Sequence, residues 1–334
     1  MFLHSVGHFH PENIITNAFL RELGLETDDA WILERVGIRT RHTVLPLDYI
    51  RDTRNQDVRQ GFKAARYDNA ETGKRAALMA VERAGIPLDK IGMVVGGNCS
   101  PDECIPAGAS RIAEALKLEV PALDINAACS SFCAQLHMLA GMRPERLPDY
   151  VLVVNAENNT RVVDYRDRST CILWGDGTSA AVLSPRIPGP WRVTESLLRG
   201  DPSGADKVRV PRDGHFAQDG AAVHAFAIKR ATEVVQELKR RYLETGEGRS
   251  SADVSFIGHQ ANLRMLEGVA RRTEIAPEQH LFNIHARGNC GAAGAPTVLS
   301  ENWESAALGK ALVMAVVGSG LTWSGVLLER TPGL

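Results

Sequence analysis

The feature of this sequence that most constrains its fold is an alternation of short apolar runs with helical patterns, repeated in both halves of the chain. The stretches with helical spacing of apolar residues are 71–86, 108–118 and 223–243. The runs that read as buried strands are 91–97, 120–126, 150–158, 179–184, 254–262, 311–320 and 321–330. Alternation of this kind predicts an α/β layered fold in which mixed sheets are covered by helices.

The two halves also resemble each other weakly. IGMVVGGNCS in the first half compares with VSFIGHQANL in the second, and ILWGDGTSAAVLS compares with VVGSGLTWSGVLLER. Two matches in the same order predict duplicated halves, which the Pro- and Gly-rich stretch 184–191 divides into residues 1–184 and 185–334. Strand ends from both halves would converge on one central cleft. The polar, Arg-rich stretch 46–69 predicts an excursion on the surface.

Composition excludes several classes of function. A formal net charge of −2 over 334 residues gives no global sign of a nucleic-acid binder or a membrane-surface protein. The chain has neither a basic-then-apolar leader nor an apolar run approaching 18 residues, so we expect a cytoplasmic protein that is neither exported nor inserted in a membrane. Its six cysteines form no CxxC and no paired Cys/His set, so we expect no metal site.

Cys129 lies at a junction between a predicted strand, a turn of small residues and a predicted helix over 130–142. The partial positive charge and free N–H groups of a helix N-terminus favour a thiolate. The small neighbours Ala127, Ala128 and Ser130 let a substrate approach closely. Free cysteine is also among the most buried residue types. The junction alone therefore leaves two interpretations, a packed core thiol and a nucleophile.

Two polar residues of the second half are candidate partners for this cysteine. His259 ends a predicted strand where it opens into the cleft, and Asn289 lies in a run of Gly and Ala that permits a tight backbone. Each also has a structural interpretation, as a core or capping histidine and as a turn-forming asparagine. Beside a cysteine, however, an asparagine amide can donate to a developing oxyanion. The glycine-rich stretch 317–325 offers backbone N–H groups to the same cleft.

Cysteine, histidine and asparagine together are typical of two chemistries. Papain-like proteases place the cysteine first, with the histidine and asparagine far downstream. Cys129, however, lies mid-chain and lacks the surrounding residues of that family. The second chemistry is acyl transfer through a thioester, followed by formation of a carbon–carbon bond. The duplicated α/β pattern favours the second.

Six stretches that together cover nearly the whole chain resemble the thiolase superfamily, and within it the ketoacyl-ACP synthase III family of condensing enzymes. They are DAWILERVGIRTRH (29–42), DINAACSSF (124–132), DRST with WGDGTSAAVL (167–183), GHQANLRML (258–266), GNCGAAGAP (288–296) and GSGLTWSG (318–325). The first and fourth are the most specific, whereas WGDG is shared more widely. This resemblance implies a thiolase-like fold, in which two duplicated halves form a five-layered αβαβα arrangement, and it implies a homodimer.

The same resemblance implies a decarboxylative condensation in fatty-acid or polyketide biosynthesis. Cys129 would take an acyl group from acyl-CoA or acyl-ACP, and the backbone N–H groups of Cys129 and Ser319 would form the oxyanion hole. His259 and Asn289 would hold the thioester carbonyl of a malonyl extender while it loses CO₂, and the product would be a 3-oxoacyl thioester. No cofactor is implied, because coenzyme A or phosphopantetheine only carries the substrate.

The resemblance also assigns the walls of an entrance tunnel. Trp31 and Arg168 match a pair that sandwiches the adenine of coenzyme A, while Arg35 and Asn262 match residues beside its phosphates and pantetheine. Ile105 stands where an aromatic residue often limits the acyl pocket. A basic stripe near the entrance fits an acidic carrier protein, although it also fits a solvated helix face; it consists of Arg264, Arg271 and Arg272.

Three departures from the family pattern leave the donor and the acceptor open. They are Ile105, the long excursion at 46–69, and Gly-Asn-Cys-Gly at 288–291 in place of Gly-Asn-Thr-Ser. They favour an enzyme of specialised metabolism. One alternative is an acyltransferase or chain-joining enzyme that uses the same acyl-cysteine with a non-malonyl acceptor, and another is a non-catalytic binder of carrier protein. The presence of both His259 and Asn289 argues against these alternatives, because decarboxylation is the step that needs both.

Overall fold

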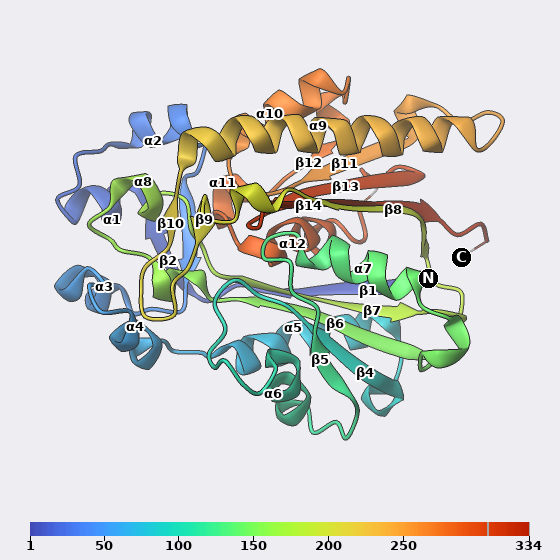
Figure 1. Ribbon diagram of the computed structural model, residues 1–334, viewed down its shortest axis with the longest axis horizontal. Helices are drawn as coiled ribbons and strands as arrows, with labels where there is room; N and C mark the ends of the chain where they lie inside the picture. Colours follow the sequence, from blue (N-terminus) through green and yellow to red (C-terminus); the bar gives the residue numbers. More distant parts are fainter. Residues whose placement is uncertain (306, 334) are drawn as a thin grey trace.

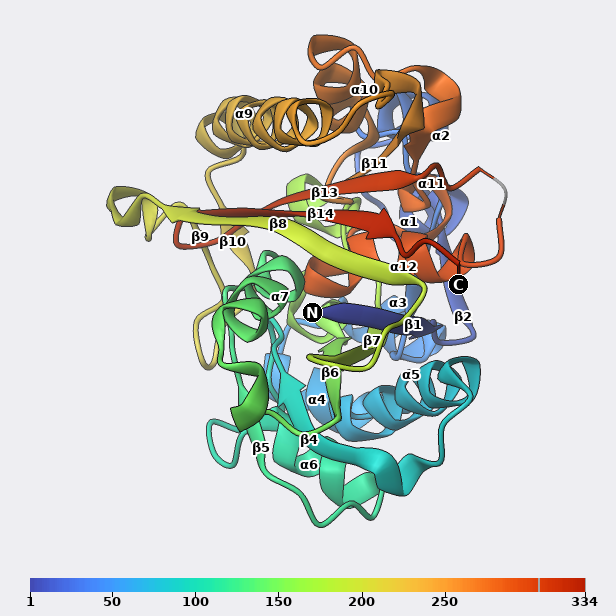
Figure 2. The same ribbon diagram turned by 90° about the vertical axis from the view of Figure 1, so that its right-hand side faces the viewer.

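The computed structural model describes residues 1–305 and 307–333, in which a ten-stranded sheet and its helices stack in layers (Figure 1). The strand order is β12–β11–β13–β14–β8–β1–β7–β6–β4–β5. The two central strands β1 and β8 pair only at one end, where Phe2 lies opposite Arg192 and Leu3 lies opposite Trp191. The sheet therefore divides into two five-stranded half-sheets that diverge from this joint (Figure 2).

The elements of each half follow in chain order. The first half contains β1 (Phe2–Phe9), β2 (Asn13–Thr16), α1 (Asn17–Glu22), α2 (Asp29–Arg35), β3 (Thr40–Thr43), α3 (Leu47–Thr53), α4 (Val58–Ala64), α5 (Asn69–Ala84), β4 (Ile91–Gly96), α6 (Gly108–Ala115), β5 (Ala122–Asp124), α7 (Ser131–Gly141), β6 (Tyr150–Glu157), α8 (Arg168–Cys171) and β7 (Gly177–Ser184). The second half contains β8 (Trp191–Gly200), β9 (Val208–Arg209), β10 (Ala217–Gln218), α9 (Gly220–Glu244), β11 (Val254–Gly258), α10 (Leu263–Arg272), β12 (His280–Leu281), α11 (Ile284–Arg287), α12 (Gly294–Glu301), β13 (Ala311–Gly318) and β14 (Thr322–Arg330).

The helices complete a five-layered arrangement. Helices α7 and α12 lie between the two half-sheets, α5 and α6 cover the outer face of the first half-sheet, and α9 and α10 cover the outer face of the second (Figure 1). The expected αβαβα layers are thus confirmed. Among the described residues, none of the helices combines the length and the apolar character needed to cross a membrane.

The halves repeat one sequence of elements. The series β1, α5, β4, α6, β5, α7, β6, β7 in the first half corresponds to β8, α9, β11, α10, β12, α12, β13, β14 in the second. Strand β7 ends at Ser184 and β8 begins at Trp191, so the expected seam falls in the loop between them. The division into two domains at residue 184 stays a prediction.

The stretch 46–69 is more ordered than a surface excursion. It forms α3 and α4, and the side chains of Ile50 and Val58 are buried. Between the two helices the fully buried Asn55 donates its amide hydrogens to the carbonyls of Arg161 (2.9 Å) and Val163 (2.8 Å). The expectation is therefore wrong for the inner face of this stretch, because its few apolar residues and one amide tie it to the segment after β6.

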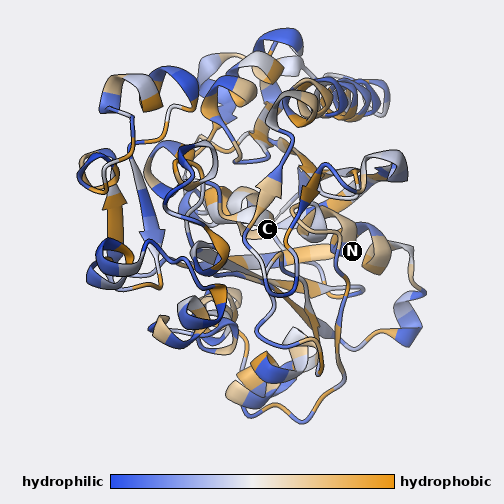
Figure 3. Cartoon of the chain, turned by 60° about the vertical axis from the view of Figure 1, so that its left-hand side comes forward, coloured by the Kyte–Doolittle hydropathy of each residue, from blue (hydrophilic) through white to orange (hydrophobic). Residues whose placement is uncertain are grey.

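Apolar residues (orange) concentrate on the interior strands, and polar residues (blue) on the outer helices (Figure 3). The central helix α7 departs from the usual amphipathic pattern, since all of its residues from Ser131 to Leu136 are buried. This first part of α7, which a half-sheet covers on both sides, has no face that meets water, whereas Met138 in its last turn is 44% exposed. The helix predicted over 130–142 is therefore present as α7, and its first six residues pack inside the protein.

Asp176, in the WGDG stretch, is a buried carboxylate that holds two backbone segments together just before β7. Its Oδ2 accepts the backbone N–H of Val44 (2.7 Å), and its Oδ1 accepts that of Thr160 (2.8 Å). Burial raises the pKa of Asp176 to about 6. One residue earlier, the N–H of Gly175 donates to the carbonyl of Asn289 at 3.1 Å. Asp176 therefore anchors the segment before β7, whose Gly175 holds the backbone of Asn289.

We predict that Asp176→Ala lowers the free energy of unfolding by about 3 kcal/mol or more, because it leaves two buried N–H groups without an acceptor. Urea titration followed by circular dichroism measures this change. Asp48→Ala, at a side chain that is 87% exposed, is the control and should change the stability by about 0.5 kcal/mol at most. Equal effects of the two substitutions would contradict an anchoring role.

Candidate active site

The turn that carries Cys129 is held in an uncommon backbone conformation. Ala128 has a φ of 49°, a left-handed value that disfavours residues with a Cβ. Its N–H donates to Oδ1 of Asn126 (2.9 Å), and the N–H of Ala127 donates to Oγ of Ser131 (2.9 Å). Strain of this kind persists where surrounding contacts over-determine it, as at functional sites. The turn places Cys129 just before α7, where its side chain lines a cavity.

The glycine-rich loop after β13 packs directly on this turn. A Cβ at Gly318 would lie 2.7 Å from the carbonyl oxygen of Ala127 and 2.9 Å from the nitrogen of Ser130, so only glycine fits there. The next residue, Ser319, lines the same cavity as Cys129. The two residues expected to form an oxyanion hole are therefore brought together.

His259 reaches the cavity from the other half-sheet. It follows β11 directly, and its backbone N–H donates to the carbonyl of Ala315 on β13 at 2.9 Å. Its side chain is buried, and the Nδ1 atom has no partner among the described residues. The pairing to β13 thus fixes the backbone of His259 where its side chain lines the cavity.

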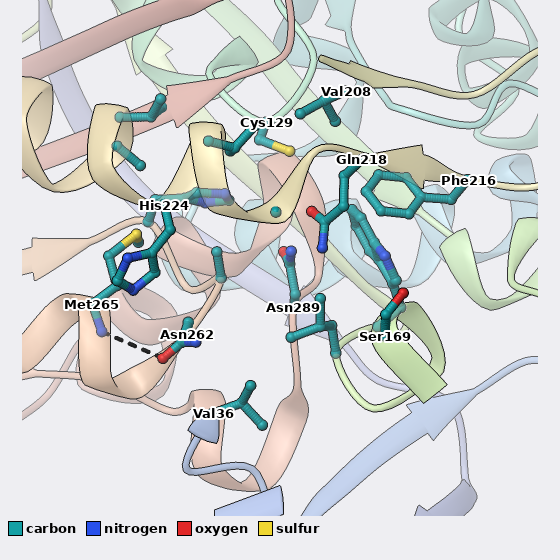
Figure 4. A pocket seen from close by; sticks show the side chains of 18 of the residues that line it. Val36, Cys129, Ser169, Val208, Phe216, Gln218, His224, Asn262, Met265 and Asn289 are labelled. Carbon is teal, nitrogen blue, oxygen red and sulfur yellow. Dashed lines mark hydrogen bonds between the residues drawn. The ribbon is translucent and has the colours of Figure 1, made fainter. Parts of the chain in front are cut away.

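Asn289 is oriented by hydrogen bonds at both ends of its residue. Its backbone N–H donates to Leu173 (2.8 Å), and its side-chain Oδ1 accepts the N–H of Gly291 (3.0 Å). Because the oxygen is engaged, the amide NH₂ group is the part left to act as a donor. Figure 4 shows the side chains of Cys129 and Asn289 directed into the same space.

Cys99, which sequence analysis did not single out, lies beside the candidate nucleophile. The two sulfur atoms are 3.8 Å apart. A hydrogen bond from the Cys99 thiol, followed by the interaction with His259, holds the pKa of Cys129 well below the usual value for cysteine despite burial. The same hydrogen bond raises the pKa of Cys99. This hydrogen bond therefore favours the thiolate form at Cys129 and the thiol form at Cys99.

A second unpredicted residue, Glu157, links the two halves of the site. Its Oε2 accepts the N–H of Cys99 (2.9 Å), and its Oε1 accepts the N–H of Ala292 (2.8 Å). Burial, followed by the nearby charge of Cys129, raises the pKa of Glu157 to about 8. One carboxyl group thus joins the loop after β4 to the segment that follows Asn289. Its position as a charged residue near the end of the strand predicted over 150–158 was the only sequence signal that could have indicated it.

Cys129 lies between two cavities of about 440 Å³ each. His259 and Asn289 line the first, which opens toward Trp31. Cys99 lines the second, and Trp174 and Phe216 line both. The first cavity thus contains the side chains of His259 and Asn289, and the second has room for a group attached to the Cys129 sulfur.

The aromatic residue at the entrance lies between two guanidinium groups. Arg35 lies 4.4 Å and Arg168 5.0 Å from the ring centroid of Trp31, and all three residues line the first cavity. An adenine ring stacked between Trp31 and Arg168 needs about 7 Å, two contacts of about 3.5 Å. The pair must therefore separate before it can hold a nucleotide.

Asn262 and Arg264, two of the other residues expected at the entrance, already have hydrogen-bond partners within the chain. Asn262 caps α10, where its Oδ1 accepts the N–H of Arg264 at 2.8 Å, and its Nδ2 donates to Arg35. Arg264 uses its guanidinium to reach the carbonyls of Glu34 and Leu33 and to pair with Glu267. Arg271 and Arg272 lie at the other end of α10, about 10 Å away. The stripe is therefore split along the helix, and its nearest arginine already has partners.

Ile105 does not line the acyl pocket within this chain. Its side chain is 85% exposed in the loop before α6, and neither cavity beside Cys129 includes it. The expectation is wrong for a single chain, because the second cavity is bounded instead by residues of β9, the segment after β6 and the Cys129 turn. Among the described residues, no cluster of three His, Cys, Asp or Glu side chains could hold a metal ion.

Comparison with known proteins gives matches along the whole chain. Family models described as 3-oxoacyl-[acyl-carrier-protein (ACP)] synthase III and its C-terminal region match residues 123–202 and 246–330. A beta-ketoacyl-[acyl-carrier-protein] synthase III from Sulfurimonas denitrificans is 31% identical, over 98% of this chain and 97% of that relative.

Solved structures agree in fold. The 3-oxoacyl-[acyl-carrier-protein] synthase III from Aquifex aeolicus VF5 has a TM-score of 0.85 at 27% identity, covering 98% of this chain and 99% of that one. The priming beta-ketosynthase from the R1128 polyketide biosynthetic pathway has a TM-score of 0.81 at 26% identity, covering 99% and 97%. The similarity therefore extends through all five layers and not through the site alone.

We predict that Cys99→Ala shifts the pH midpoint for alkylation of Cys129 upward, because the thiolate loses its strongest hydrogen bond. Iodoacetamide labelling from pH 5 to 10, read by peptide mass spectrometry, measures the midpoint. A Cys104→Ala background removes an exposed thiol. Cys99→Ser retains a donor and should restore part of the shift. Identical midpoints in all three proteins would show that Cys99 does not stabilise the thiolate.

Proposed function

Because this chain belongs to the 3-oxoacyl-[acyl-carrier-protein] synthase III family, we propose that it condenses an acyl group held on Cys129 with a malonyl thioester in fatty-acid or polyketide biosynthesis. One observation carries this assignment of roles. Cys129 has a lowered pKa and shares a cavity with His259 and with the oriented amide of Asn289.

In the first step the Cys129 thiolate attacks the carbonyl carbon of an acyl thioester. A sulfur–carbon bond forms on Cys129, and the bond to the donor sulfur breaks, so that coenzyme A or carrier protein leaves as a thiol after taking up one proton. The N–H groups of Cys129 and Ser319 stabilise the oxyanion of the tetrahedral intermediate. The lowered pKa of Cys129 favours the thiolate that this attack requires.

In the second step a malonyl thioester enters the first cavity and loses CO₂. The electron pair of the breaking carbon–carbon bond moves onto the thioester oxygen, where His259 and the NH₂ group of Asn289 donate hydrogen bonds. The resulting enolate carbon attacks the acyl carbon on Cys129. The Cys129 thiolate leaves, and a 3-oxoacyl thioester is released. Neutral donors suit this step because the negative charge of the malonyl carboxylate reaches this oxygen only as CO₂ leaves.

The substrates we propose are an acyl-CoA or acyl-ACP donor and a malonyl-ACP acceptor. Both carry a phosphopantetheine arm, which fits the long first cavity that runs from Trp31 to Cys129. Arg35 and Arg168 supply positive charge at its mouth. No separate cofactor takes part, because each bond change uses electrons of the two thioesters.

We predict that Asn289→Ala lowers formation of the 3-oxoacyl product by about 100-fold or more, because one donor to the enolate is lost. Acylation of Cys129 should stay within tenfold of the unchanged protein. Acyl-CoA donors are added first and the mass of the intact protein is measured, after which malonyl-ACP is added and the product is quantified.

Two further variants make this result specific. Cys129→Ala should show no mass gain from any donor, and Asn302→Ala, an asparagine outside the first cavity, should behave as the unchanged protein. Acylation of Cys129 without any 3-oxoacyl product would favour the acyltransferase alternative. Failure of every donor to acylate the folded protein would overturn both enzymatic assignments.

We also propose that two copies of the chain pair through strand β5. This strand is an edge of the ten-stranded sheet, and Leu123 on it is 39% exposed. An uncovered apolar edge strand is a ready template for pairing with another chain. A second copy would also cover the exposed side chain of Ile105 in the neighbouring loop.

The prediction is a molar mass twice the 36.3 kDa of one chain, measured by light scattering during size-exclusion chromatography. Leu123→Glu should give the mass of a single chain, because like charges would face each other across the pair. Leu78→Glu, on another exposed leucine (42%), is the control and should leave the dimer intact. A single-chain mass for the unchanged protein would overturn the proposal.

A further inference from the structure

Cys99 and Cys129 form a pair of thiols at the centre of the candidate active site. Their sulfur atoms are 3.8 Å apart, although 30 positions separate the two residues in the chain. Both cysteines are free in the structure. A disulfide bond is about 2.05 Å long, so its formation would bring the two sulfur atoms about 1.8 Å closer. Rotation about the Cα–Cβ bonds of the two side chains moves the sulfur atoms by distances of this order.

The two thiols differ in their readiness to be oxidised. The hydrogen bond between them lowers the pKa of Cys129 and raises that of Cys99. A peroxide reacts with the thiolate form of cysteine, and redox-sensitive cysteines combine a low pKa and access to the oxidant with a second thiol nearby. Cys129 therefore suits the attack on an oxidant, and Cys99 suits the second attack that resolves the product.

The cavities give access to the Cys129 sulfur from more than one direction. Cys129 lines the first cavity, which opens toward Trp31, whereas Cys99 lies outside the described lining of that cavity. Cys99 and Cys129 both line the second cavity. A small oxidant that enters by the first cavity therefore reaches the Cys129 sulfur on a side that Cys99 does not occupy. Cys99 is then left free to attack the same sulfur from the second cavity.

We propose that hydrogen peroxide oxidises Cys129 and that Cys99 then closes a disulfide bond with it, which makes this pair a reversible oxidation site. In the first step the Cys129 thiolate attacks one peroxide oxygen. A sulfur–oxygen bond forms, the oxygen–oxygen bond breaks, and the hydroxide that leaves takes up one proton, so that sulfur is oxidised to a sulfenic acid and peroxide is reduced to water. In the second step the Cys99 sulfur attacks the Cys129 sulfur, and the hydroxyl group leaves with the Cys99 proton as a second water.

Glu157 keeps the resolving thiol in place for the second step. Its Oε2 accepts the backbone N–H of Cys99 at 2.9 Å, so the loop after β4 stays close to Cys129. A thiol held there traps the sulfenic acid before further oxidation gives an irreversible sulfinic acid. The disulfide would also prevent acylation of Cys129 until it is reduced. This last consequence rests on the proposed function, whereas formation of the disulfide does not.

The test uses the full-length protein with Cys104→Ala, which removes an exposed thiol close to Cys99 in the chain. Hydrogen peroxide is added, free thiols are blocked with iodoacetamide, and the protein is digested without reduction. Chymotrypsin cleaves after Phe132 and so separates Cys129 from Cys133. We expect mass spectrometry to find a peptide cross-linked between Cys99 and Cys129. Acylation by acyl-CoA donors should fall by about tenfold or more and return with dithiothreitol, because the nucleophile is blocked reversibly.

Two comparisons make this result specific. In Cys99→Ser the resolving thiol is absent, so Cys129 should gain two oxygen atoms as sulfinic acid, and dithiothreitol should not restore acylation. The protein that keeps Cys104 is the matched control and should form the same cross-link. The cross-link is read on protein that contains Cys99, so it decides the question even where the serine variant does not fold.

The inference is overturned if hydrogen peroxide leaves Cys129 unmodified, or if it oxidises Cys129 without a cross-link to Cys99. A cross-link in a protein that no donor acylates before oxidation would overturn the proposed function and leave the oxidation site standing. Acylation that is equally fast in the cross-linked and the reduced protein would show that Cys129 is not the acyl acceptor, which again contradicts the proposed function alone.

Discussion

The burial of α7 between two half-sheets is the constraint on which the rest of the site depends. The covered part of α7 is buried all round, so its polar side chains need hydrogen-bond partners and its first turn must fit against whatever lies at its end. Gly318 packs against the turn before α7, and a Cβ there would overlap the backbone of Ala127 and Ser130. The left-handed Ala128 completes this turn. Close packing thus leaves Cys129 one backbone position, at the boundary of two cavities.

Electrostatics then determines what Cys129 can do in that position. Full burial alone would raise the pKa of a thiol, as it does for Cys171, whose pKa it raises to about 12. At Cys129 the hydrogen bond from Cys99 and the presence of His259 outweigh burial and reverse the direction. Glu157 holds the backbone of Cys99 in place while itself having a pKa of about 8. The lowered pKa of Cys129 therefore depends on a residue 30 positions earlier in the chain.

The sequence predicted what local pattern controls, and it missed what long-range packing controls. The strands, the layered fold and the junction at Cys129 follow from periodicity and small residues. The contact with Cys99 depends on the way β4, β5 and α7 meet, which periodicity does not encode. The partners of Arg264 are backbone carbonyls of α2, and no charge pattern indicates them. The exposure of Ile105 and the buried Asn55 likewise depend on which loops come into contact.

Duplication explains why the unpredicted residues lie where they do. The end of β11 supplies His259, and the equivalent end of β4 supplies Asn98 and Cys99. The segment before α12 supplies Asn289, and the equivalent segment before α7 supplies Cys129. The second half thus supplies His259 and Asn289 to the first cavity, and the first half supplies Asn98 and Cys99 to the second. Because the two halves share one series of elements, equivalent positions bring polar or thiol side chains to the surroundings of Cys129 from both half-sheets.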